Sequence, residues 1–228
     1  MARQSPIELE FSRKYDREHA RQYLHKHSDG LARRLSHWRD EHLARRALAL
    51  AGQPQVVLDL PCGAGRFWPL LAEQPERSLL AADNSADMLA VARAAQPAEV
   101  VTRVRTFQTS AFAIDLPPAA VDSIFCMRLL HHIAEPAHRL AMLREFHRVT
   151  RDSLIVSLWV DGNYKAWKRR RLERRRSAQD NRNRFVIPRA VIESEFAMAG
   201  FRVQGHYDFL PGYAMWRVYV LRKCGSGQ

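Results

Sequence analysis

Two aspartates and two glycines stand at positions where a protein chain can bind a sugar-containing ligand. Asp59 lies in an apolar run that leads into a loop holding Gly63 and Gly65, and Asp83 ends the next apolar run. Glycine allows a positive φ and lets the backbone approach a ligand that a β-carbon would block. An acid at a strand end roughly 20 residues past such a loop binds ribose hydroxyls. The spacing predicts a ribose-containing ligand, with a surface aspartate that caps the next helix as the alternative for Asp83.

The loop by itself does not separate dinucleotides from S-adenosylmethionine, because both ligands use a glycine bend after a first strand. The dinucleotide fingerprint, G-x-G-x-x-G, places a third glycine where the following helix packs closely on the strand. Trp68 occupies that third position. The bulky indole therefore disfavours NAD as the ligand.

Two adjacent histidines, His131 and His132, follow the fourth apolar run of the chain. The ordinary pKa of histidine lies near neutrality, so histidine is the natural base for an acceptor hydroxyl or amine. We expect His131 to be the catalytic residue that faces the acceptor, with helix capping or packing beneath the loop as the open alternative. We expect no metal, because the pair lacks ligand spacing with a nearby acidic cluster.

Short apolar runs alternate with helical patterns through the middle of the chain. This alternation predicts parallel strands with helices on both faces of the sheet. Two later runs, FRVQGHYDFL and AMWRVYVLRK, are joined through Pro211-Gly212, and so short a turn predicts antiparallel pairing. The expected strands are 56–60, 78–83, 101–107, 121–127 and 153–160, and the expected helices are 8–27, 31–52, 66–73, 85–95, 136–149 and 188–199. We predict an N-terminal helical cap over 1–50 and an α/β domain over 51–228.

The segments VVLDLPCGAGR, LLAADNSADMLAVAR, SAFAIDLP and VDSIFCMRLLHHI follow one another in this order. In that order they resemble the class I S-adenosylmethionine-dependent methyltransferases over roughly residues 50–160. The LHH segment is the most discriminating piece, because dinucleotide enzymes do not carry it. The resemblance implies a Rossmann-like three-layer sandwich whose mostly parallel seven-stranded sheet ends in an antiparallel hairpin. It also implies methyl transfer from S-adenosylmethionine, with S-adenosylhomocysteine as the product.

The same resemblance implies which residues contact the cofactor. The loop from Pro61 to Gly65 would pack against the methionine part, Asp83 would hold the ribose, and Ser110 with its neighbour would lie beside the adenine edge. Pro61 replaces the usual first glycine of the family, and Ser110 stands where the family often has aspartate. The complete implied set is Asp59, Pro61, Gly63, Gly65, Asp83, Asn84, Met88, Ser110, Ala111 and Met127.

The net charge of +12 is concentrated in residues 164–184, where ten Lys and Arg stand against two Asp and Glu. We expect an insertion over about 161–187 to form a basic lid. Guanidinium groups bind phosphate and carboxylate bidentately, so residues 165–176 are predicted to contact an anionic ligand or a membrane surface. A solvated helix is the open alternative. The residues expected to contact the acceptor are Tyr15, Tyr164, Trp167 and Arg169.

The sequence leaves the methyl acceptor open. A small metabolite and an anionic acceptor, such as a lipid-linked or cell-envelope saccharide, both suit the pattern. RNA would suit the charge, but we find no recognised RNA-binding module and no aromatics interleaved with the basic run. The departures at Pro61 and Ser110 keep open a catalytically inactive, cofactor-binding regulatory protein.

Length and composition set the outer limits. The 228 residues, 46% of them hydrophobic, fit one domain with a single substantial core. We expect no secretory signal and no membrane-spanning helix, since no run approaches roughly 20 apolar residues. Cys62, Cys126 and Cys224 are odd in number and far apart, which favours a reducing cytoplasm. A monomer or a homodimer is expected.

Overall fold

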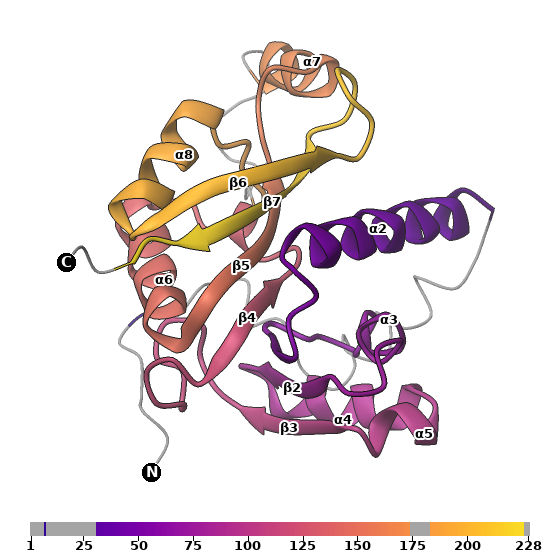
Figure 1. Cartoon of the computed structure of the whole chain (residues 1–228). Coiled ribbons are helices and arrows are strands. Elements are labelled where there is room, and N and C mark those ends of the chain that lie inside the picture. The colour runs from indigo at the N-terminus through magenta and orange to yellow at the C-terminus, as the bar shows by residue number, and fades with distance from the viewer. Residues whose placement is uncertain (1–6, 8–30, 174–182, 226–228) are drawn as a thin grey trace.

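The computed structural model describes residues 7, 31–173 and 183–225 and is built around one seven-stranded sheet. The strand order is β3-β2-β1-β4-β5-β7-β6, and Figure 1 shows helices packed on both sides of the sheet. The first five strands are parallel, and β7 is antiparallel to both β5 and β6. The predicted Rossmann-like fold class is confirmed. The strands are β1 (Val56–Asp59), β2 (Ser78–Asp83), β3 (Val104–Gln108), β4 (Val121–Cys126), β5 (Thr150–Trp159), β6 (Phe201–Asp208) and β7 (Trp216–Lys223).

Alternation of side chains along the central strands creates two large cores, one on each face of the sheet, and a smaller apolar cluster surrounds Trp68. On one face Ile124 and Leu154 pack with apolar side chains of α6 and α8. On the other face Phe125 and Ile155 pack with α2 and α3. The central strands are apolar on both sides because helices cover both sides. The helices are α2 (Leu31–Leu50), α3 (Trp68–Leu71), α4 (Ala86–Ala95), α5 (Ala98–Val101), α6 (Pro136–Val149), α7 (Tyr164–Glu173) and α8 (Arg189–Met198), with a 3₁₀ turn, η2 (Leu130–His132).

The expected strand over 101–107 is wrong at its start. Pro97 precedes a short helix, α5, and β3 begins only at Val104. Proline suits a helix start, because its missing N–H has no acceptor there and its φ is already near the helical value. The apolar pair Val100-Val101 is therefore helical and packs toward the core beside Trp68 and Leu89.

The N-terminal cap is described only through α2, which lies along one face of the sheet (Figure 1). The expected helix over 8–27, including Tyr15, falls outside the described residues, so the boundary of the cap remains a prediction. No helix in the described part of the chain is both long enough and apolar enough to span a membrane.

Parallel strands bring the functional segments of the sequence to one edge of the sheet. The loops that follow β1, β2, β4 and β5 all leave the sheet at its carboxyl edge. The glycine loop, Asp83, the histidine pair and the start of α7 are thereby gathered from segments more than a hundred residues apart.

Candidate active site at the carboxyl edge

The glycine loop after β1 has the backbone conformation that its sequence predicts. Gly63 and Gly65 have φ of +54° and +70°, in the left-handed region that favours glycine. A β-carbon on Gly65 would lie 2.8 Å from the Trp68 ring, and Trp68 is fully buried beneath the loop. The Gln96 side chain donates a hydrogen bond to the Ala64 carbonyl at 2.9 Å. The loop is therefore held from below by α3 and from the side by the end of α4.

Asp83 fastens the end of β2 to this loop. Its carboxylate accepts hydrogen bonds from the N–H of Gly63 and the N–H of Ser85, each at 3.0 Å. The cap of α4 is Ser85, whose Oγ accepts from the Met88 N–H at 3.3 Å. Burial raises the pKa of Asp83, and its backbone donors act in the opposite direction. Asp83 is buried and therefore not a surface aspartate, although it does accept the Ser85 N–H at the start of α4.

Asp59 provides a second buried carboxyl group beside the first. Burial, followed by the charge of Asp83, raises the pKa of Asp59 well above its ordinary value. Its Oδ2 atom has no hydrogen-bond partner among the described residues. Two neighbouring buried carboxyl groups repel each other when both are ionised, so this end of the loop favours a ligand with positive charge and hydroxyl donors.

The remaining residues expected at the cofactor follow the other strands of this edge. Met88 and Met127 are buried, Met88 lies against Gly63, and Asn84 is exposed directly after β2. Ser110 follows β3, and its hydroxyl accepts a local hydrogen bond from the Phe112 N–H at 3.2 Å. The structure thus brings Met88 together with the glycine loop. It gives Ser110 a partner within its own turn, and Ala111 is half-buried beside it.

His131 lies in η2 and is 2% exposed. Its ring stacks on Trp159 with centroids 5.1 Å apart and meets the edge of Trp216 at 4.7 Å. Burial, with the nearby charges of His132, Arg184 and Arg128, lowers the pKa of His131 to about 2. The ring is therefore neutral at neutral pH but is a weak proton acceptor. Its role as a base stays a prediction.

Three arginines surround these rings. Arg169 lies over Trp159 with its guanidinium carbon 5.2 Å from the ring centroid, and Arg184 lies 5.8 Å from the same ring. Arg128 lies over Trp216 at 5.0 Å. We call His131, Trp159, Trp216 and these three arginines the arginine–aromatic cluster. Of the residues expected to contact the acceptor, Arg169 belongs to this cluster, and Arg184 also comes from the predicted lid.

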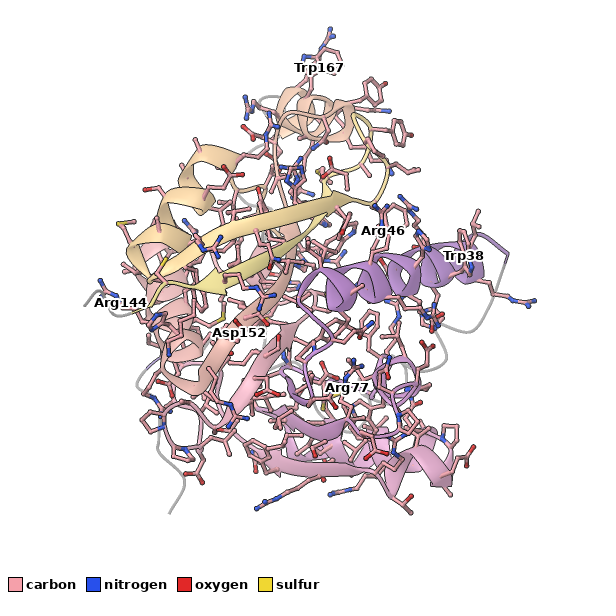
Figure 2. All side chains as sticks on the ribbon, in the orientation of Figure 1. Trp38, Arg46, Arg77, Arg144, Asp152 and Trp167 are labelled. Carbon is pink, nitrogen blue, oxygen red and sulfur yellow. The ribbon has the colours of Figure 1, made fainter. Side chains whose placement is uncertain are left out.

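Tyr164 and Trp167 lie at the surface, and their expected contact with the acceptor stays a prediction. Tyr164 stacks on Tyr213 with ring centroids 5.7 Å apart, and Trp167 is 57% exposed. Figure 2 shows Trp167 pointing outward at the end of the molecule. In this structure both side chains face the surface beside the turn between β6 and β7 rather than the arginine–aromatic cluster.

Asp40 in α2 is a functional candidate that the sequence did not reveal. Its buried carboxylate accepts from Arg66 at 2.8 Å and from Arg128, so it joins the end of the glycine loop to the end of β4. Arg128 has a φ of +64°, an unusual conformation for a non-glycine residue and one that clusters at functional sites. No local sequence pattern signals a positive φ at arginine, and the partners of Asp40 are distant in sequence.

The described residues contain no group of three or more His, Cys, Asp or Glu side chains that could hold a metal ion. Carboxyl groups lie on the loop side of this edge, and guanidinium and aromatic groups lie on its β4–β5 side.

Comparison with known proteins shows similarity to methyltransferases. Residues 57–153 match the family model described as "Methyltransferase domain". An uncharacterized protein of Synechococcus is 33% identical over 112 residues, which cover 46% of this chain and 27% of that protein. The tRNA (carboxymethyluridine(34)-5-O)-methyltransferase alkbh8 of Xenopus tropicalis is 25% identical over 167 residues, 70% of this chain and 24% of its own. The matched regions span about a quarter of the length of these curated relatives.

A solved structure extends the likeness to nearly the whole chain. Magnesium protoporphyrin IX methyltransferase from Synechocystis PCC 6803, crystallised with bound SAH, superposes with a TM-score of 0.74. The alignment covers 93% of this chain and 98% of that one at 15% identity. At such an identity the likeness establishes the fold alone. Together, the fold and the family match confirm the predicted resemblance.

Proposed function

We propose that this chain, whose residues 57–153 match a methyltransferase domain, is a class I methyltransferase that transfers a methyl group from S-adenosylmethionine to an anionic acceptor. One observation carries the proposal: two buried carboxyl groups, Asp59 and Asp83, lie beside the glycine loop at the carboxyl edge of the sheet. Ligands of such sheets bind at this edge.

The charges beside the loop fit this cofactor. S-adenosylmethionine carries a sulfonium, an ammonium group and two ribose hydroxyls, which complement buried carboxyl groups, whereas a pyrophosphate would add further negative charge. When bound, the cofactor supplies a methyl group on a positively charged sulfur. In our proposal Asp83 accepts hydrogen bonds from the ribose, and the unpartnered oxygen of Asp59 stabilises positive charge. The other proposed contacts are Pro61, Gly63, Gly65, Asn84, Met88, Ser110, Ala111 and Met127.

The arginine–aromatic cluster supports an anionic acceptor. Guanidinium groups bind carboxylate or phosphate bidentately, and flat rings favour a planar or apolar body next to that anion. Methyl transfer from a sulfonium needs an aligned acceptor and the exclusion of water more than it needs an elaborate catalytic set. We assign this alignment to Arg128, Arg169 and Arg184, which approach the rings from three separate segments.

His131 remains our candidate for the catalytic contact. Because its pKa is lowered to about 2, His131 removes protons poorly. An acceptor oxygen that is already ionised needs no base, so it suits this site best. We expect His131→Asn to lower kcat at least about tenfold with unchanged affinity for S-adenosylhomocysteine, since the ring packs against the acceptor cluster. Single-turnover rates and calorimetry measure the two effects. A near-normal rate would remove His131 from the mechanism.

Cofactor binding is tested first, by calorimetry with S-adenosylmethionine and S-adenosylhomocysteine. We expect Asp83→Asn to weaken binding at least about tenfold, because a hydrogen bond to a charged acceptor contributes roughly 1.5–3 kcal/mol. Asp115→Asn changes an exposed aspartate after β3 and is expected to bind like the unaltered chain. No heat with either compound, or equal affinities for both variants, would contradict the cofactor assignment.

The acceptor is tested by following a radiolabelled methyl group into a fractionated extract of the source cell. We expect label in small anionic molecules or anionic lipid-linked saccharides. Label in RNA would instead support an RNA methyltransferase, a possibility raised by the Xenopus tropicalis relative, a tRNA methyltransferase. Cofactor binding without transfer to any fraction would support the catalytically inactive regulatory protein.

A further inference from the structure

The end of the molecule beyond the sheet carries large apolar side chains in contact with solvent. Two segments supply them: α7 and the turn between β6 and β7. Each of the five side chains is between 47% and 57% exposed. Trp167 marks this end of the molecule in Figure 2. We define the aromatic tip as Tyr164, Trp167, Leu172, Leu210 and Tyr213.

The two segments of the tip are fixed to each other by backbone contacts. The Tyr164 N–H donates to the Gly212 carbonyl at 2.9 Å, and the Lys165 N–H donates to the Tyr213 carbonyl at 3.0 Å. The Tyr164 and Tyr213 rings stack at 5.7 Å with only 12° between their planes. The tip is therefore one preformed surface made from segments almost fifty residues apart in sequence.

Cationic side chains lie among these rings. The Lys165 Nζ atom is 5.1 Å from the Tyr213 ring centroid, and the Arg171 guanidinium is 5.7 Å from the Trp167 ring. Lys168 and Arg170 are exposed on the same helix. Asp161 lies 3.9 Å from Arg170 and neutralises part of this charge. Residues 164–184 nevertheless carry eight more basic than acidic side chains.

This combination matches the interface of a bilayer. Trp and Tyr rings settle at the level of lipid headgroups, with their apolar part toward the acyl chains. Lys and Arg bury their stems and keep their charges at the headgroups, and each contributes about 1 kcal/mol near an anionic surface. We propose that the aromatic tip binds reversibly to an anionic membrane surface. This inference goes beyond methyl transfer and does not depend on it.

Two features favour lipid over single-stranded nucleic acid, which also stacks on aromatic rings. Leu172 in the last turn of α7 and Leu210 in the same turn as Tyr213 add exposed aliphatic surface, on which bases do not stack. The Tyr164 and Tyr213 faces are stacked on each other, so neither presents two open faces to a base. Aliphatic surface beside amphipathic rings is suited to shallow insertion between headgroups.

Docking at the tip would also hold the candidate active site near the membrane. Arg169 belongs to the same helix as Trp167, and it lies over Trp159 of the arginine–aromatic cluster. When the protein is docked on a membrane, the same helix, α7, therefore contacts the lipid through Trp167 and the arginine–aromatic cluster through Arg169. This arrangement suits an acceptor held at the membrane, and it rests on the proposed function, whereas the docking itself does not.

Co-sedimentation of the full chain with vesicles tests the docking. Vesicles of phosphatidylcholine alone are compared with vesicles that contain about one quarter phosphatidylglycerol. We expect the chain to sediment with the anionic vesicles only and to be released by high salt, because exposed charges are screened. Equal sedimentation with both vesicles, or with neither, would overturn the proposal.

Two tryptophans with the same exposure provide a matched pair of variants. Trp167 in the tip and Trp38 in α2 are each 57% exposed, and Figure 2 shows them on different parts of the molecule. We expect Trp167→Ala to weaken vesicle binding at least about fivefold and Trp38→Ala to leave it unchanged. Equal loss in both variants, or no loss in Trp167→Ala, would refute the tip as the docking surface.

The charge contribution has its own control. Replacement of Lys168, Arg170 and Arg171 by Gln is expected to abolish the preference for anionic vesicles, and circular dichroism checks that the variant folds. Replacement of Arg105, Arg144 and Arg202, three exposed arginines on β3, α6 and β6, removes the same charge elsewhere and is expected to keep the preference. Binding of single-stranded RNA that depends on Trp167, without binding to anionic vesicles, would identify nucleic acid as the occupant and overturn the proposal.

Discussion

Gly65 and Trp68 determine the shape of the glycine loop together. The sequence predicts a positive φ at Gly65 from the loop pattern alone, and it predicts that Trp68 breaks the dinucleotide fingerprint. The structure adds the reason that both residues occur: the indole fills the space beneath Gly65 that a β-carbon would need. The loop is thus packed on an aromatic ring where the dinucleotide pattern has a third glycine.

Gly65→Ala is expected to destabilise the protein by about 2–4 kcal/mol, because alanine is strained at a φ of +70° and its β-carbon meets Trp68 at 2.8 Å. Gly212→Ala is the matched control, since Gly212 has the same φ and nothing within 4 Å of the added β-carbon. The Gly212→Ala variant should lose only about 1 kcal/mol of unfolding free energy, because it adds backbone strain without a steric clash. Urea unfolding measures both, and equal losses would show that contact with Trp68 has no effect.

Residue patterns failed where a residue depends on distant partners. Asp59, Gly63 and Asp83 were predicted because strand ends and spacing are local in sequence. Arg128 and Asp40 were not, because a positive φ at arginine and an ion pair 88 residues apart have no local signature. The geometry around the proposed cofactor contacts was therefore more predictable than the geometry around the proposed acceptor contacts.

At the scale of elements, α2 is connected to the site through Asp40. The carboxylate is buried between Arg66, which ends the glycine loop, and Arg128, which follows β4. Loss of one partner from a buried ion pair leaves an uncompensated charge. Through Asp40, α2 therefore stabilises both the glycine loop and the arginine–aromatic cluster.

Asp40→Asn is expected to cost about 3–5 kcal/mol of unfolding free energy, because two guanidinium groups lose their buried counter-charge. Glu73→Gln breaks the exposed pair with Arg45 and should cost at most about 1 kcal/mol. Urea unfolding compares the two variants, and calorimetry should find weaker S-adenosylhomocysteine binding in Asp40→Asn alone. Equal unfolding losses would show that Asp40 acts as an ordinary surface charge.

Element boundaries were predicted well where apolar periodicity was strong and poorly where one short run suited two structures. The sequence predicted β2 at its observed bounds, and α6 likewise. The run VTRVRTF (101–107) was assigned wholly to a strand, although Val101 ends α5 and β3 begins only at Val104. Short apolar runs fit either structure, and the packing beside Trp68 decided the outcome.

For the molecule as a whole, the histidines make stability depend on pH in one direction. Among the described histidines, burial lowers the pKa values of His37, His131, His132, His147 and His206. A histidine whose pKa is lower in the folded than in the unfolded protein binds fewer protons when folded. Its contribution to stability is complete above its unfolded pKa and decreases as the pH falls below that value.

His131 should contribute most to this acid sensitivity, because its pKa falls from 6.5 to about 2. Below pH 6.5 the unfolded chain gains a proton at this position that the folded chain does not bind. The free energy of unfolding should therefore fall by about 1.4 kcal/mol per pH unit from His131 alone until the pH approaches 2. Urea unfolding at several pH values below 6.5 measures this slope.

The slope, rather than the absolute stability, identifies the responsible residue. His131→Asn cannot gain the proton, so its unfolding free energy should depend less steeply on pH even if the substitution destabilises the fold. His147→Asn is the comparison, because His147 is less buried and has its pKa lowered by burial and by the charge of Lys223. We expect a smaller change in slope there. A slope in His131→Asn equal to that of the unaltered chain would mean that His131 keeps its ordinary pKa in the folded protein, and its description as a weak proton acceptor would be wrong.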